Sequence, residues 1–138
     1  MSPERFPPDD PREWLNRARS SLAQAGAALP GIYLEDLCFN AQQAVEKALK
    51  SLLLRRGVRF PYVNDLAELF HLLEQAGEPI PSRVRDAEQL TDYAVEARYP
   101  GLAEPVSHEE YEEALALAET VVRWAEERLR GESEEGGP

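Results

Sequence analysis

Apolar residues recur at helical spacing in each long segment of the chain. The first such segment begins with a capping box at Asp10 and Glu13, and a proline occupies its first helical position. The second runs from about Ile32 to Arg56 and is followed by a glycine. Residues three or four apart lie on one side of a helix, so each segment is predicted to bury one face. In the first helix, that face contains Trp14, Ala18, Leu22, Ala25 and Leu29.

The second half of the chain shows the same periodicity. A third helix is predicted over about 65–76, before a glycine. A fourth is predicted from about Ser82 to Arg98 or Tyr99, because the residue before a proline disfavours the helical region. A capping box at residues 107–110 then opens a fifth helix, which is predicted to end at Gly131.

No segment alternates polar and apolar residues with the period of two that is typical of strands. We therefore predict an all-α fold, an antiparallel up-and-down bundle of about five helices that is related to the four-helix bundle. The predicted domain spans residues 1–131, and a disordered acidic tail is predicted over residues 132–138.

Composition narrows the class of protein. A chain of 138 residues is expected to form one domain, and its net charge of -11 opposes non-specific binding to DNA. The single cysteine, Cys38, excludes an internal disulfide and favours a cytoplasmic location. No apolar run is long enough to span a membrane. Two histidines and one cysteine without ligand spacing predict no metal site, and no motif indicates a cofactor.

The second predicted helix carries side chains of mixed character opposite its apolar face. Phe39, Gln43 and Leu54 lie on this opposite side together with long charged residues. A face that combines Phe and Leu with polar groups favours a partner surface over a plain solvated face, and we predict a homodimer or a higher even assembly. In the fifth helix, Leu117 and Trp124 lie off the apolar stripe, where contact with a second copy and burial under another helix of the same chain are both open.

Basic residues cluster at the end of the second predicted helix. The functional interpretation is a phosphate-binding patch for a nucleotide or RNA, since Lys and Arg are suited to anionic oxygens. The alternative is structural, because cations near the carboxyl end of a helix complement its dipole. The cluster consists of Lys47, Lys50, Arg55, Arg56 and Arg59.

Two segments, Phe39 to Lys50 and Arg98-Tyr99-Pro100-Gly101, resemble the HEPN family, the higher-eukaryote-and-prokaryote nucleotide-binding domain. The resemblance covers roughly Trp14 to Leu129 and implies a helical bundle that dimerises. The Arg98-Tyr99-Pro100 sequence is similar to HEPN proteins that accompany minimal nucleotidyltransferases. It implies that Arg98 and Tyr99 contact a nucleotide, RNA or the partner enzyme.

Nuclease members of the family pair such an arginine with a histidine four to six residues later, and a small polar residue usually follows the arginine. Here the next residue is Tyr99, and His108 follows Arg98 after nine intervening residues. The family ribonuclease motif is therefore incomplete, and no catalytic residue is predicted. Imidazole suits proton transfer near neutral pH, so a ribonuclease that uses Arg98 with a displaced His108 is the first alternative.

The resemblance and the residues together predict a non-catalytic, dimerising HEPN module. It is expected to bind a nucleotidyltransferase partner, a nucleotide, or both, in a toxin–antitoxin-like system. The predicted nucleotide contacts are Arg98, Tyr99, Lys47 and Lys50, and the predicted interface residues are Phe39, Gln43, Leu54 and Trp124. A helical bundle that serves only in assembly is the second alternative.

Overall fold

The computed structural model describes residues 3–60, 65–96 and 105–135 of the chain. These residues form helices joined by loops and contain no strand, which confirms the predicted all-α fold. The elements are α1 (Pro11–Ala25), α2 (Leu34–Arg55), α3 (Leu66–Gln75), α4 (Ser82–Arg85), the 3-10 helix η1 (Asp86–Asp92), α5 (Tyr93–Glu96) and α6 (His108–Glu135).

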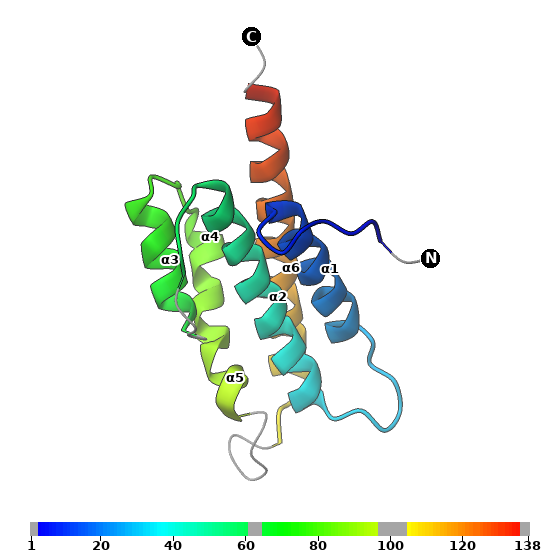
Figure 1. The fold of residues 1–138 in the computed structure, drawn as a ribbon. Coiled ribbons are helices and arrows are strands. Elements are labelled where there is room, and N and C mark those ends of the chain that lie inside the picture. The colour runs from blue at the N-terminus through cyan, green and yellow to red at the C-terminus, as the bar shows by residue number, and fades with distance from the viewer. Residues whose placement is uncertain (1–2, 61–64, 97–104, 136–138) are drawn as a thin grey trace.

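The helices pack side by side around α2, with α1, α3, α5 and α6 against it (Figure 1). After α2 the chain turns back before α3 begins, so α2, α3 and α6 point towards one end of the bundle and α1 points towards the other. A hydrogen bond from the Tyr111 hydroxyl to the Ala25 carbonyl joins the start of α6 to the end of α1. At the other end, Arg56, just after α2, donates to the carbonyl of Ala76, just after α3.

The apolar stripes form one core. Phe70 of α3 and Leu49, Leu52 and Leu53 of α2 are among its largest fully buried side chains. Thirteen of the 22 residues of α2 are buried, so this helix has little free surface. The predicted stripe of α6 is likewise buried or half-buried along its length, from Tyr111 to Leu129.

Local signals in the sequence set the helix ends. The Asp10 side chain accepts from the amide of Arg12, and Ser107 and Glu110 exchange two side chain-to-amide bonds, as a capping box requires. The predicted capping box at Asp10 forms only in part. The Glu13 side chain accepts from the amide of Phe6, whereas a complete capping box would have it accept from the amide of Asp10. It therefore ties the amino-terminal segment to α1.

Three boundaries differ from the predictions. Leu29 was expected in the first apolar stripe, but α1 ends at Ala25 and Leu29 lies in the following loop with 63% of its surface exposed. The fourth predicted helix is interrupted by η1, a tighter turn type that rarely continues beyond a few residues. The last helix does not stop at Gly131; it continues to Glu135, into the segment that was predicted to be disordered.

Candidate functional site

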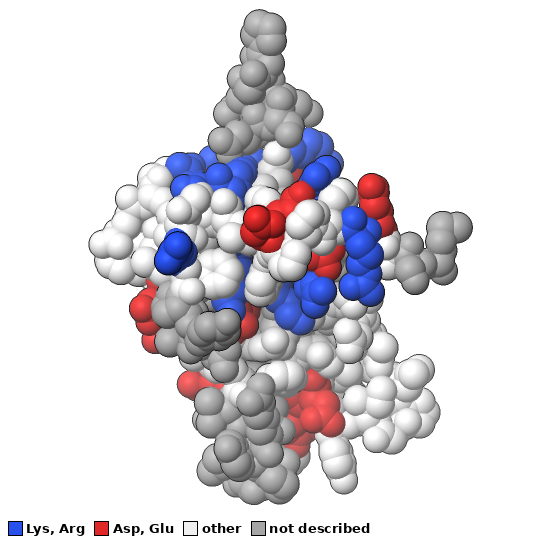
Figure 2. Space-filling model, viewed as in Figure 1, with Lys and Arg blue, Asp and Glu red and all other residues white. Residues whose placement is uncertain are grey.

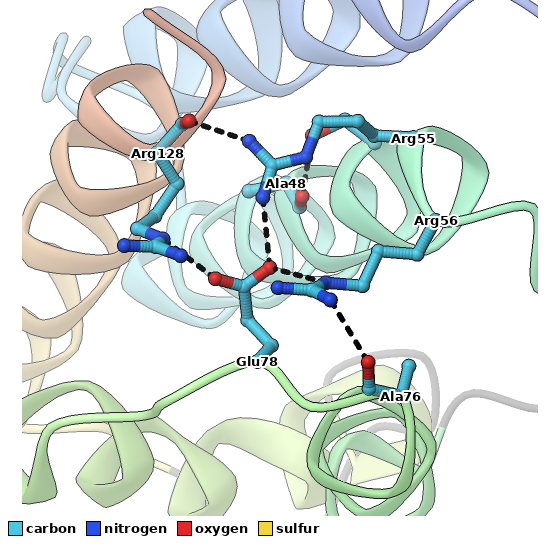
Figure 3. Close-up of polar contacts among 7 residues, drawn as sticks. Ala48, Arg55, Arg56, Ala76, Glu78 and Arg128 are labelled. Atoms are coloured by element: carbon cyan, nitrogen blue, oxygen red, sulfur yellow. Dashed lines mark hydrogen bonds and ion pairs between the residues drawn. The ribbon is translucent and has the colours of Figure 1, made fainter. Parts of the chain in front are cut away.

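The predicted basic cluster divides into parts with different surroundings. Arg55 and Arg56, at the end of α2, turn towards Glu78 in the loop between α3 and α4 (Figure 3). One Glu78 oxygen accepts from Arg55 Nη2 and from Arg56 Nε, each at 2.9 Å. The other accepts from Arg128 Nε of α6 at 2.6 Å. Three arginines thus hold one carboxylate that is fully buried, and we call this group the Glu78 clamp.

Two glycine turns position the Glu78 clamp. Gly57 and Gly77 both have positive φ, which L residues with side chains rarely adopt. Each ends its helix in a Schellman turn, in which the amide of the residue after the glycine bonds back to the helix. In the second of these turns that residue is Glu78, whose amide donates to the Leu73 carbonyl at 3.0 Å. The turn therefore directs the Glu78 side chain back towards α2.

The Glu78 clamp favours the structural interpretation for Arg55 and Arg56. Burial alone would raise the pKa of Glu78, but hydrogen bonding from Arg56 and the nearby charge of Arg128 hold it below its ordinary value. Glu78 is therefore ionised at neutral pH. The helices and the loop that meet here are tied together by charge-assisted hydrogen bonds.

The Lys50 ammonium is also occupied by contacts within the protein. Its ammonium lies 3.2 Å from Glu46 Oε2, and both side chains are almost completely buried. The same ammonium lies 5.1 Å from the ring centroid of Phe60 and 5.6 Å from that of Trp14, which is cation–π distance. The sequence prediction placed Lys50 at a phosphate site, but its charge is paired with a carboxylate and covered by two aromatic rings.

Lys47 has a different environment, although it lies one turn from Lys50. Its ammonium donates to the Ser21 hydroxyl of α1 at 2.9 Å. Within the described residues, no carboxylate oxygen lies within ion-pair distance of this ammonium, whereas Lys50 has one. Burial is the largest cause that lowers the pKa of Lys47. A half-buried cation without a carboxylate ligand is a candidate contact for an anion.

Lys47 lines a pocket of about 290 Å³ between α1, α2 and the amino-terminal segment. The amino-terminal segment is held over α1 by the Phe6–Glu13 bond and by Asn16 Nδ2, which donates to the Glu4 carbonyl. We call this cavity the Lys47 pocket. Its lining residues are Pro3, Glu4, Arg5, Glu13, Asn16, Arg17, Ser20, Ser21, Gln24 and Lys47.

The charges of the Lys47 pocket favour an anion. Three cations (Arg5, Arg17 and Lys47) face two carboxylates there, in a chain whose overall charge is strongly negative. Glu13 is occupied, because it accepts from the amide of Phe6 and from Arg17 Nε, and these bonds hold its pKa below the ordinary value. Figure 2 shows basic side chains gathered over the start of α1 and the end of α2, on the face that it presents.

The predicted nucleotide contacts Arg98 and Tyr99 lie outside the described residues. His108 is exposed at the first residue of α6, directly after the capping serine. Sequence reasoning missed Ser21, Arg17 and Arg5 as companions of Lys47. A signal for part of this lining was present, because Glu13, Arg17, Ser20 and Gln24 form a polar stripe along the first helix.

The predicted interface residues fall into two groups. Phe39, Gln43 and Leu54 are half-buried on α2, and neither Phe39 nor Leu54 belongs to the core cluster of the described chain. Trp124 is 4% exposed and belongs to that core. For Trp124 the structure therefore supports the intramolecular alternative over contact with a second copy.

Metal-binding and membrane-spanning features are absent from the part of the chain that the structure describes. These residues contain no group of three His, Cys, Asp or Glu side chains that could hold a metal ion. Among the same residues, no helix is long and apolar enough to cross a membrane.

Comparison with known proteins places these features in a family context. The model of the HEPN domain family matches residues 11–129. The crystal structure of TT1696 from Thermus thermophilus is 35% identical over 85% of this chain and 96% of that chain, with a TM-score of 0.68. The crystal structure of ST0689, an archaeal HEPN homologue, is 25% identical over 86% of this chain and 97% of that chain, with a TM-score of 0.69. No curated protein is significantly similar in sequence.

Proposed function

This chain belongs to the HEPN domain family, and we propose that it is a non-catalytic, dimerising module that binds a nucleotide through the Lys47 pocket. The observation that carries this proposal is the Lys47 ammonium, which is half-buried beside Ser21 and without an ion-pair partner among the described residues. Arg98 and Tyr99 stay predicted contacts from the sequence. The proposal extends to a nucleotidyltransferase protein as partner, in a toxin–antitoxin-like pair, which an adjacent nucleotidyltransferase reading frame would support.

Replacing Lys47 with methionine should weaken nucleotide binding strongly. A charged hydrogen bond is worth about 1.5–3 kcal/mol, so the affinity for ATP should fall by roughly ten- to a hundredfold. Isothermal titration of wild type and Lys47→Met with ATP measures this loss. Arg83→Met is the matched control, because it removes one positive charge from an exposed position on α4. Equal ATP affinities of wild type and Lys47→Met would contradict the proposal.

The stability of the same variant distinguishes a functional lysine from a structural one. Because burial lowers the pKa of Lys47, the fold disfavours its charge. Lys47→Met should therefore unfold at a urea concentration no lower than wild type, even though it binds ATP poorly. A loss of both stability and binding would point to a structural role for Lys47 instead.

Self-association is the second part of the proposal. Phe39 is half-buried and lies on the side of α2 opposite the apolar stripe that the sequence predicts, and we place it at the contact between two copies. Phe39→Glu should shift the protein towards monomer in sedimentation velocity, because it would bury an unpaired charge at the contact. Gln75→Glu adds the same charge at an exposed position of α3 and should leave the assembly unchanged. A wild-type protein that is monomeric at high micromolar concentration would rule out this part.

The two alternatives make different predictions. A ribonuclease that uses Arg98 with His108 would cleave RNA, and Arg98→Ala and His108→Ala would each abolish the cleavage. A module that serves only in assembly would bind no nucleotide but would still depend on Phe39. Assays of RNA cleavage, ATP binding and assembly on one set of variants therefore separate the three functions.

A further inference from the structure

The lining of the Lys47 pocket differs from that of a site built to hold a nucleobase. Apart from Pro3, each lining residue is polar or charged, and none of those that the structure describes is aromatic. Proteins usually read bases by stacking them on aromatic rings and by hydrogen bonds to their edges. The Lys47 pocket instead presents ammonium, guanidinium and hydroxyl groups, which suit phosphate oxygens.

The donors of the pocket can be counted. A lysine ammonium has three N–H donors, and Lys47 uses one of them on Ser21. Arg17 uses its Nε on Glu13, and within the described residues its terminal amino groups have no hydrogen-bond partner. Arg5 lies 3.9 Å from Glu13, and its side chain is 75% exposed at the mouth of the pocket. These groups leave enough donors for more than one phosphate.

The size of the pocket points the same way. Pockets that enclose a whole drug-sized ligand usually measure roughly 300–1,000 Å³. At about 290 Å³ the Lys47 pocket is slightly smaller than this range. The pocket is therefore too small to enclose a whole nucleoside triphosphate, and its polar lining favours the phosphate groups as the enclosed part.

We infer that the Lys47 pocket recognises the polyphosphate of a nucleoside di- or triphosphate and does not discriminate between bases. This inference rests on the proposed function, because it takes the Lys47 pocket as the nucleotide site. Glu4 and Glu13 also line the pocket, so the phosphates are expected beside Lys47, whose ammonium has no carboxylate within ion-pair distance among the described residues.

Competition against a fluorescent ATP analogue tests the inference. Full-length protein is titrated with ATP, CTP, pyrophosphate and adenosine without divalent cations, so that the phosphates carry their full charge. ATP and CTP should compete with affinities within a few-fold of each other, pyrophosphate should displace the analogue completely, and adenosine should not displace it. Arg17→Gln should lower the affinities for ATP and for pyrophosphate by the same factor. This factor should be on the order of tenfold, which corresponds to the loss of one charged contact.

The outcomes separate this inference from the proposed function. If ATP binds more than about tenfold tighter than CTP (a difference of about 1.4 kcal/mol) and adenosine competes, the pocket reads the base and the inference is wrong. The proposed function then stands, provided that Lys47→Met weakens ATP binding at least about tenfold, as expected above. If neither ATP nor CTP binds to wild type, both are wrong, even if pyrophosphate binds. An unequal effect of Arg17→Gln on ATP and pyrophosphate would also overturn the inference.

Discussion

Glu78→Gln should destabilise the protein by roughly 3–5 kcal/mol, because removal of one partner from a buried ion pair leaves uncompensated charge. Glutamine keeps the size of the side chain and one carbonyl oxygen but removes the charge that Arg55, Arg56 and Arg128 share. The loss should be at the lower end of this range, since the Arg128 side chain is 36% exposed and can turn to water. Urea unfolding of wild type and variant measures the difference.

An exposed ion pair nearby provides the control for Glu78→Gln. Glu74 of α3 pairs with Arg85 of α4, and its side chain is 47% exposed. Exposed pairs contribute about 0–1 kcal/mol, so Glu74→Gln should change stability little. If the two variants lose the same stability, the Glu78 clamp contributes no more than a surface pair.

The Glu78 clamp also predicts how stability depends on pH. The pKa of Glu78 is held below its ordinary value of 4.5 in the folded protein. The contribution of ionised Glu78 to the free energy of unfolding is therefore complete above the pKa that Glu78 has in the unfolded state. It is lost as the pH falls through the lower pKa that Glu78 has in the folded state. Wild-type stability should decrease more steeply than that of Glu78→Gln below about pH 4.5, the ordinary pKa of a glutamate.

The fold could be predicted because its signals are local. Caps at Asp10 and Ser107 and glycine stops at Gly57 and Gly77 act within one turn of chain, and they mark the helix ends that the structure shows. The interruption of the fourth helix has no such signal. Within the described residues, the Leu66 amide at the start of α3 donates to the Thr91 hydroxyl in η1, and a contact between distant segments cannot be read from periodicity.

The Glu78 clamp could not be predicted for a related reason. Glu78 follows a helix-ending glycine and precedes a proline, a context that is typical of an exposed loop. Its burial depends on where α3 places the turn relative to α2 and α6. From the sequence, Arg55 and Arg56 could be interpreted either as cations that complement the helix dipole or as phosphate ligands. In the structure their partner is a carboxylate more than twenty residues away in the sequence.

Lys47 and Lys50 show the limit of sequence-based prediction most clearly. They are three residues apart on one helix and were predicted to have the same role. In the structure, Lys50 pairs with Glu46 and lies against the rings of Trp14 and Phe60. Lys47 instead donates to the Ser21 hydroxyl of α1. The difference arises from the packing of α1 and the loop after α2, and it leads to opposite expectations for the two residues.

Lys50→Met should lower the free energy of unfolding by roughly 3 kcal/mol and leave ATP binding nearly unchanged. The Glu46 side chain is 7% exposed, so loss of the ammonium leaves a buried carboxylate with only weaker partners, such as Gln42 Nε2 at 3.4 Å. Methionine retains the length and apolar stem of lysine, which limits the packing change beneath Trp14 and Phe60. Urea unfolding and ATP titration on one preparation give both quantities.

The double variant Lys50→Met with Glu46→Leu decides why Lys50→Met is unstable. Replacement of a whole buried ion pair by apolar residues of similar volume is often neutral, so the second change should restore most of the lost stability. A coupling energy of at least about 1 kcal/mol in this double-mutant cycle would assign the loss to the unpaired charge of Glu46. If the two changes were simply additive, the loss would come from packing around Trp14 and Phe60. If Lys50→Met weakened ATP binding as much as Lys47→Met, Lys50 would belong to the phosphate site after all.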